Sequence, residues 1–227
     1  MTTLLITIVP SILILLYFFL SDKFKEPKST IVLVFVLGIL ICFPAGVLNS
    51  FMIESFGTNE FRKELTYSFL GPAWTEEILK FLVLYTVVLR RNEFNERMDG
   101  IVYGVVVSLG FATYENYDYV FRIAETWDML PSQMAIIRSY TAVPMHGLNG
   151  AIMGFYFGMY AFTANKKFLI LSLLVPFLLH GFYNFLGYPL FYLILIGMLI
   201  YALILNSNFK KLQLKKKIET ESLKIWK

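Results

Sequence analysis

Six ionisable side chains lie inside long apolar stretches of this 227-residue sequence, where water should be scarce. They are Glu76, Glu77, Lys80, Glu115, His146 and His180. The sequence contains no histidine besides these two. An ionisable group in an apolar segment costs free energy, so such groups are usually functional. Carboxylates and imidazoles accept and donate protons, and this set therefore contains the groups that general acid–base catalysis requires.

The acidic pair and the lysine have helical spacing. Side chains three or four residues apart share one face of a helix. Lys80 follows Glu77 by three residues and Glu76 by four. We therefore expect Lys80 to neutralise or hydrogen-bond the Glu77 side of the pair.

Each histidine is accompanied by an amide at a similar spacing. Asn184 follows His180 by four residues, and Asn149 follows His146 by three. An imidazole and an amide at these spacings project from the same helical face. We expect both to reach the same site.

The composition indicates the kind of element that must position these residues. Hydrophobic residues make up 57% of the sequence and charged residues only 16%, outside the range of ordinary soluble domains. A helix needs about 20 apolar residues to cross a bilayer. We predict an all-α, polytopic transmembrane bundle of about seven spans. Their predicted ranges are 2–20, 30–50, 67–89, 101–121, 138–164, 167–187 and 189–207.

Basic residues in the connecting loops indicate the orientation, because Lys and Arg concentrate in short loops on the cytoplasmic side. One set of alternate loops holds Lys23, Lys25, Lys28, Arg90, Arg91, Arg97, Lys166, Lys167 and the lysines from 210 to 227. The other set holds Arg62, Lys63, Arg122 and Arg138. We therefore expect the N-terminus outside and the C-terminus in the cytoplasm, in the inner (plasma) membrane of a bacterium.

This topology places residues from four spans at one depth. Counted from the outer ends of their spans, Glu76, Glu115, His146 and His180 lie about seven to nine residues in, which is ~10–14 Å at ~1.5 Å per residue. We interpret them as one site in the outer half of the bilayer.

The chain reads as a single membrane domain over residues 1–208, followed by a basic cytoplasmic tail over 209–227. Such a tail is typical of contact with anionic lipid rather than with nucleic acid. Cys42 is the single cysteine and excludes an intrachain disulfide. Gly150, Gly154 and Gly158 recur every four residues, which predicts close helix packing.

Four motifs carry a family resemblance. They are Glu76-Glu77-x-x-Lys80, Phe111-x-x-x-Glu115, an isolated His146, and His180-x-x-x-Asn184, in this order on successive spans. In this order they resemble the PrsW branch of the CAAX-protease and bacteriocin-processing superfamily, over roughly residues 67–190. The resemblance implies an intramembrane endopeptidase, acting on a single-pass membrane protein or peptide, for example in the first cut of an anti-sigma factor during envelope stress. The prenyl-protein endopeptidases of the superfamily differ, with a longer first motif that ends in Arg and a His where Glu115 stands.

Peptide hydrolysis needs a base for water, donors for the oxyanion and a proton for the leaving amine. We expect Glu76 to be the base, with His146 and Glu115 orienting the water and shuttling the proton. His180 and Asn184 would donate to the oxyanion, and Glu77, held by Lys80, would position Glu76 or the substrate strand. The supporting residues would be Lys80, Phe111 and Asn149. The cut would then fall near the extracytoplasmic face.

Other interpretations stay open. We expect no cofactor, but Glu76, Glu115, His146 and His180 would be the ligands of a Zn²⁺ ion if hydrolysis were metal-dependent. A proton-coupled transporter or channel would also place Glu and His in a membrane. A non-catalytic membrane scaffold is the third alternative. A wet cavity around the site would favour the enzyme, and a dry, fully paired cluster would favour the scaffold.

Overall fold

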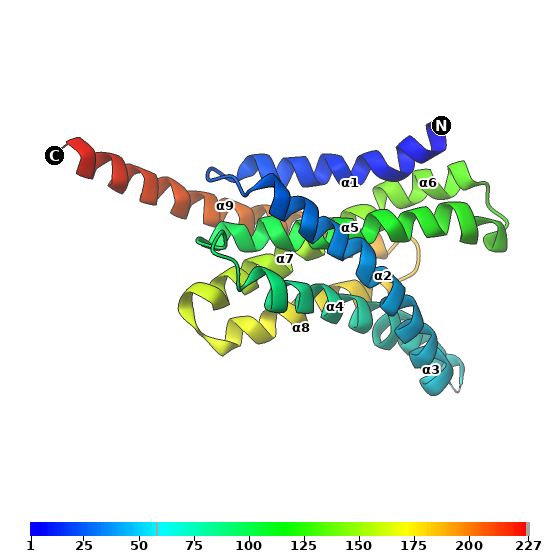
Figure 1. Ribbon diagram of the computed structural model, residues 1–227. Coiled ribbons are helices and arrows are strands. Elements are labelled where there is room, and N and C mark those ends of the chain that lie inside the picture. Colours follow the sequence, from blue (N-terminus) through cyan, green and yellow to red (C-terminus); the bar gives the residue numbers. More distant parts are fainter. Residues whose placement is uncertain (58, 226–227) are drawn as a thin grey trace.

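The computed structural model describes residues 1–57 and 59–225, apart from the side chains of residues 216–225, and its regular elements within these ranges are all helical (Figure 1). The longer elements are α1 (Thr2–Ser21), α2 (Lys28–Phe56), α3 (Glu60–Leu65), α4 (Trp74–Val83), α5 (Arg97–Asp118), α6 (Pro131–Tyr140), α7 (Ala142–Thr163), α8 (Lys166–Phe185) and α9 (Phe191–Ile225). Shorter π-helical turns, η1 (Thr66–Ala73), η2 (Leu84–Val88) and η3 (Tyr119–Ile123), and a 3₁₀ turn, η4 (Ala124–Trp127), extend or join them. The all-α prediction is confirmed.

Within the described residues, four helices are long and apolar enough to cross a membrane: α1, α2, α8 and the Phe191–Lys215 part of α9. The other expected spans correspond to η1–α4–η2, to α5–η3 and to α6–α7. Seven spans with an outer N-terminus remain a prediction.

One predicted span is interrupted near its start. The range 138–164 was expected to be continuous, but α6 ends at Tyr140 and α7 begins at Ala142. Pro144 explains the break, because a proline ring clashes with the carbonyl four residues earlier, which here belongs to Tyr140. The break leaves Pro144 in the first turn of α7, where no N–H is needed.

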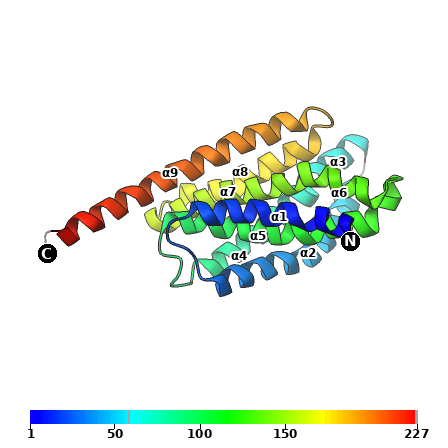
Figure 2. The ribbon, with the colours of Figure 1, turned by 90° about the horizontal axis from the view of Figure 1, so that it is seen from above.

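The centre of the bundle is the contact between α5 and α7 (Figure 2). A Cβ atom on Gly154 would lie 2.0 Å from the carbonyl oxygen of Gly100, and one on Gly104 would lie 2.3 Å from that of Gly150. The two backbones therefore touch, as the glycine spacing predicts. This contact fixes the position of α7 relative to α5.

The outer helices present large apolar side chains to their surroundings. Leu13 on α1, Val47 on α2, Ile170 on α8 and Leu193 on α9 are each at least 60% exposed. In α5, by contrast, every residue from 98 to 112 is buried. An apolar exterior around a buried, more polar centre suits a protein whose solvent is lipid.

The predicted boundary between membrane domain and tail falls inside α9. This helix continues past residue 208, and the side chains of Phe209 and Gln213 are buried against the bundle. Its last turns then project beyond the other helices (Figure 1). Residues 226 and 227, the end of the predicted tail, lie outside the described residues.

Candidate active site

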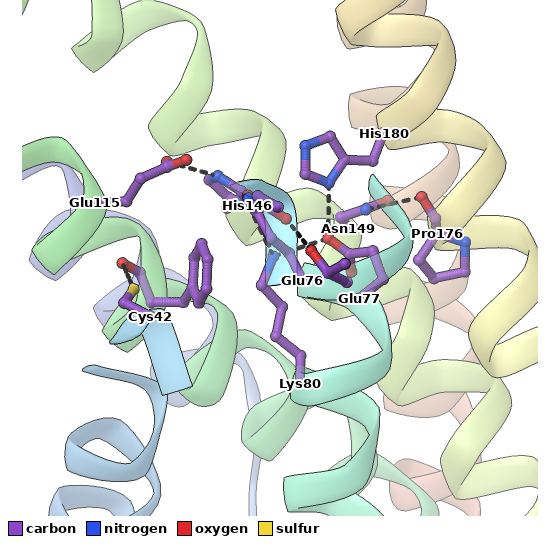
Figure 3. Close-up of polar contacts among 12 residues, drawn as sticks. Cys42, Glu76, Glu77, Lys80, Glu115, His146, Asn149, Pro176 and His180 are labelled. Atoms are coloured by element: carbon purple, nitrogen blue, oxygen red, sulfur yellow. Dashed lines mark hydrogen bonds and ion pairs between the residues drawn. The ribbon is translucent and has the colours of Figure 1, made fainter. Parts of the chain in front are cut away.

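The six ionisable residues singled out in the sequence lie together, and they come from four helices (Figure 3). Helix α4 contributes Glu76, Glu77 and Lys80, α5 contributes Glu115, α7 contributes His146, and α8 contributes His180. Their polar atoms form one continuous chain of contacts. The structure therefore brings these residues together, while their depth in a membrane remains a prediction.

Lys80 lies at the centre of this cluster and is fully buried. Its ammonium nitrogen is 2.8 Å from Oε1 of Glu77, 3.0 Å from Nδ1 of His146 and 3.8 Å from Oε2 of Glu76. The same nitrogen lies 4.4 Å from the ring centre of Phe111, a cation–π distance. The lysine therefore serves as the shared counter-ion of α4 and the hydrogen-bond donor to α7.

The partners of His146 determine its protonation. An ammonium can only donate, so Nδ1 accepts from Lys80, while Nε2–H donates to Oε2 of Glu115 at 3.0 Å. The imidazole is then neutral, and neither nitrogen is free. In this arrangement His146 has no nitrogen with which to shuttle a proton.

His180 is held in the opposite tautomer. Its Nδ1 lies 2.9 Å from Oε1 of Glu77, and an ionised carboxylate only accepts, so Nδ1 carries the proton. The other nitrogen, Nε2, has no hydrogen-bond partner among the described residues. Because His180 lines the cavity described below, this nitrogen is available to a substrate, a water or an ion.

Arg138 completes the cluster, and the sequence did not predict its role. Its guanidinium donates to Oε2 of Glu115 at 2.6 Å and to Oδ1 of Asn116 at 2.9 Å, and it lies 3.9 Å from the ring centre of Tyr119. The sequence offered one signal, since Arg138 is among the few basic residues assigned to the outer side and lies eight residues before His146.

Glu76 differs from the other two carboxylates of the cluster. Glu77 is paired with Lys80 and His180, and Glu115 is paired with Arg138 and His146. In Glu76, Oε1 lies 3.4 Å from the side-chain amide of Asn49, and Oε2 is buried without a hydrogen-bond partner.

A cavity of about 720 Å³, open on one side, adjoins the cluster. Glu76, Glu115, His146, His180 and Asn184 line it, whereas Glu77 and Lys80 lie behind this wall. Its rim includes exposed side chains, among them Tyr67 and Trp127. The polar cluster is thus reachable from outside and is not a dry core.

The remaining predicted residues take different positions. Asn184 is exposed at the cavity wall, with Nδ2 3.4 Å from the carbonyl oxygen of Ser68. Asn149 is buried outside the wall and donates to the carbonyl oxygen of Pro176 at 3.0 Å. Phe111 lines the cavity beside Lys80, with its ring centre 5.5 Å from that of His146. Asn149 therefore supports the site from behind the wall, whereas Phe111 forms part of the wall.

The start of α4 explains how its acidic pair reaches the cluster. Pro72 lies in the π-helical turn η1, which leads directly into α4 at Trp74. Proline removes a backbone hydrogen bond, and π-helical turns are common at functional sites. Glu76 and Glu77 follow two and three residues after this junction, so the change from π-helix to α-helix sets the face on which they project.

The cluster also contains residues that could bind a divalent metal ion. Potential ligand atoms of Glu76, His146 and His180 lie within 4.8 Å of one another. The fit is good for Oε2 of Glu76 and Nε2 of His180, since neither has another partner. His146 would have to release Lys80 or Glu115 to join them. Glu115, which the sequence suggested as a fourth ligand, is not in this group, and its Oε2 instead accepts a hydrogen bond from Nε2–H of His146.

Comparisons with known proteins identify relatives of this chain. A family model described as "PrsW family intramembrane metalloprotease" matches residues 26–207. The chain is 40% identical to Protease PrsW of Bacillus subtilis (strain 168) over 183 residues, 78% of this chain and 79% of that protein. It is 37% identical to Protease PrsW of Geobacillus kaustophilus (strain HTA426), covering 79% and 76%, and 30% identical to Protease PrsW of Clostridioides difficile (strain 630), covering 92% and 89%. No solved structure matches at a significant level.

Proposed function

Because this chain belongs to the PrsW family of intramembrane proteases, we propose that Glu76 is the base that activates water to hydrolyse a peptide bond of a membrane protein. The position of one oxygen atom carries this proposal. Oε2 of Glu76 is buried, has no hydrogen-bond partner and belongs to a residue that lines the cavity. A general base needs a free lone pair within reach of the water it deprotonates. Glu77 and Glu115 each accept a hydrogen bond from a cation, at 2.8 and 2.6 Å, whereas Oε2 of Glu76 lies 3.8 Å from Lys80, too far for a hydrogen bond.

Residues at the cavity wall can carry out each proton transfer of the reaction. Glu76 takes a proton from water as the water oxygen bonds to the carbonyl carbon, and the carbonyl oxygen becomes an oxyanion. Asn184 donates to that oxyanion through Nδ2. The carboxylic acid of Glu76 then gives its proton to the amide nitrogen as the C–N bond breaks.

His180 can take part in either of two ways, because Glu77 already holds its Nδ1–H. As a neutral imidazole, Nε2 accepts a proton or a metal ion. As an imidazolium, Nε2–H donates to the oxyanion and the Glu77 carboxylate balances the charge. The metal-free proposal uses the second form, in which His180 joins Asn184 as a donor to the oxyanion.

Lys80, Glu115, His146 and Arg138 are positioning residues in this proposal. Their contacts run from Arg138 through Glu115 and His146 to Lys80, and none of these four is left to exchange protons freely. Rigid support of this kind keeps reacting groups aligned.

Metal-dependent hydrolysis is the second candidate, favoured by the family description and by the spacing of Glu76, His146 and His180. These three residues would hold the ion, which would lower the pKa of a bound water and polarise the substrate carbonyl. The positive charge of Lys80 would then neutralise Glu77 alone, because the ion would neutralise Glu76.

The proposed substrate follows from the membrane topology predicted from the sequence. We infer a single-pass membrane protein or peptide, cut near the extracytoplasmic face in the inner membrane of a bacterium, with an anti-sigma factor as one example. The placement in the CAAX-protease superfamily belongs to the same proposal. The open cavity argues against a scaffold built on a dry cluster, and the protease relatives argue against a transporter.

The test uses purified protein with a single-pass substrate, and mass spectrometry identifies the new termini. Glu76→Gln keeps the shape of the side chain but removes the base, so we expect folded protein and no cleavage. Glu54→Gln, a change on α2 outside the cavity wall, is the control. Turnover by Glu76→Gln would overturn the base assignment. A cut at the cytoplasmic edge would overturn the location.

Chelation separates the two mechanisms. The metal-free proposal predicts unchanged cleavage after treatment with EDTA or 1,10-phenanthroline and removal of the chelator. Loss of cleavage that Zn²⁺ or another single divalent ion restores would establish the metal-dependent candidate instead.

A further inference from the structure

A second group of acidic side chains lies where α1 ends and α5 begins. It consists of Asp22, Glu26, Glu96 and Asp99, which are 2%, 5%, 7% and 0% exposed. None of them lines the catalytic cavity. Four buried carboxylates in one place require either protons or cations for balance.

Asp22 and Asp99 are each only half satisfied. Oδ1 of Asp22 accepts from the backbone N–H of Phe24 at 3.0 Å and from the Gln213 amide at 2.6 Å. Oδ2 of Asp99 accepts the N–H groups of Asn95 and Glu96, both at 2.8 Å. The second oxygen of each aspartate is buried and has no hydrogen-bond partner in the described part of the chain.

Three members of this group lack a basic partner in the described part of the chain, since no ion pair there joins Asp22, Glu26 or Asp99 to a lysine or arginine. Lys25 approaches Asp22, but its ammonium donates to the backbone oxygen. Glu26 accepts from the Tyr103 hydroxyl and also meets the Asp99 carboxyl.

We propose that Asp22, Glu96 and Asp99 bind a hard divalent cation of the Mg²⁺ and Ca²⁺ class. Their candidate ligand oxygens lie within 4.8 Å of one another. An ion bound at about 2.1–2.6 Å from each oxygen can bridge such separations. Carboxylate oxygens without nitrogen or sulfur select Mg²⁺, Ca²⁺ or Mn²⁺ over softer metals.

The surroundings suit such an ion. A cavity of about 250 Å³ lies beside the group and is lined by Glu96 and Gln213, which provides a route for the ion and its remaining waters. Gln213 donates to both Asp22 and Glu96 and so ties α9 to the site. The ion therefore holds together the α1–α2 loop, the start of α5 and the last part of α9.

The test titrates MgCl₂ and, separately, CaCl₂ into purified full-length protein stripped with EDTA. Isothermal titration calorimetry measures binding, and thermal unfolding measures Tm. We expect one binding event and a higher Tm, both kept in Glu76→Gln because that residue belongs to the other site. Asp22→Asn and Asp99→Asn should weaken binding by more than about tenfold, since each removes a charged ligand. Asn keeps an oxygen for the backbone N–H groups, so α5 can still begin normally.

Glu93→Gln is the matched control, because Glu93 lies near the same end but is partly exposed and paired with Arg91. It should bind the ion as wild type does. Bound Mn²⁺, measured by electron paramagnetic resonance on wild type and Glu76→Gln, tests the site without altering its ligands. Absence of any bound ion, or binding that survives both aspartate changes, would overturn the proposal. The proposal would also fail if metal-free Asp99→Asn had a higher Tm than metal-free wild type and no cation raised the Tm of the wild type. The acidic group would then hold a proton instead of a cation.

Discussion

The ammonium nitrogen of Lys80 lies 3.0 Å from Nδ1 of His146, although the two residues are 66 positions apart in the sequence. This contact joins α4 to α7 inside the bundle. It also fixes the tautomer of His146, because Nδ1 must accept and Nε2–H is then directed to Glu115. Lys80 is therefore more than a counter-ion for the acidic pair.

Lys80→Met should unfold or inactivate the protein. Methionine has nearly the same length but leaves Glu77 buried without its cation, and removal of one partner of a buried pair costs ~3–5 kcal/mol. We expect a lower Tm in detergent and loss of cleavage. A variant with wild-type Tm would show that the pair contributes nothing to folding.

Arg138→Gln should reduce kcat about 10- to 100-fold with a smaller change in KM, because Glu115 loses its fixed partner and His146 loses its alignment. Arg122→Gln is the matched control. Both arginines lie 2.6 Å from a carboxylate, but the Arg122 side chain is 68% exposed and that of Arg138 only 11%. An exposed pair contributes little. Equal kinetics for the two variants would contradict the positioning role.

Gly154→Ala should destabilise the bundle. Its Cβ would lie 2.0 Å from the backbone oxygen of Gly100, so α5 and α7 must separate, at a cost of ~1–3 kcal/mol or more. Gly197→Ala on α9 meets no atom within 4 Å and should be neutral or stabilising by up to ~1 kcal/mol. Denaturant unfolding in detergent measures both. The model of touching backbones fails if Gly154→Ala is as stable as Gly197→Ala.

Gly46→Leu should obstruct the substrate without weakening the fold. Gly46 lines the catalytic cavity, and a Cβ there meets no atom within 4 Å. We expect KM to rise about tenfold, equivalent to ~1.4 kcal/mol of lost substrate binding, with Tm unchanged. Gly197→Leu, outside the cavity, controls for the added side chain. An unchanged KM would indicate that substrate enters elsewhere.

Part of this site could be predicted from sequence because its signals are local. The i, i+3 and i, i+4 spacing around Lys80 depends only on the helical period, and Glu76, Glu115, His146 and His180 stand out because each lies in an apolar segment. The glycines of α7 likewise indicated a close helix contact. The break before α7 was also encoded locally, by Pro144, although the predicted span ran through it.

The partners across helices were decided by the tertiary structure. Which face of α5 meets α7 depends on the touching backbones at Gly100 and Gly154, and rotation of either helix would pair His146 differently. Sequence placed Arg138 in a loop, but only folding brings it to Glu115. The meeting of Asp22 with Asp99, 77 residues later, is of the same kind. Residue types and helical period thus determined which ionisable groups lie in apolar helices and which of them share a helical face, whereas helix packing decided which donor meets which acceptor.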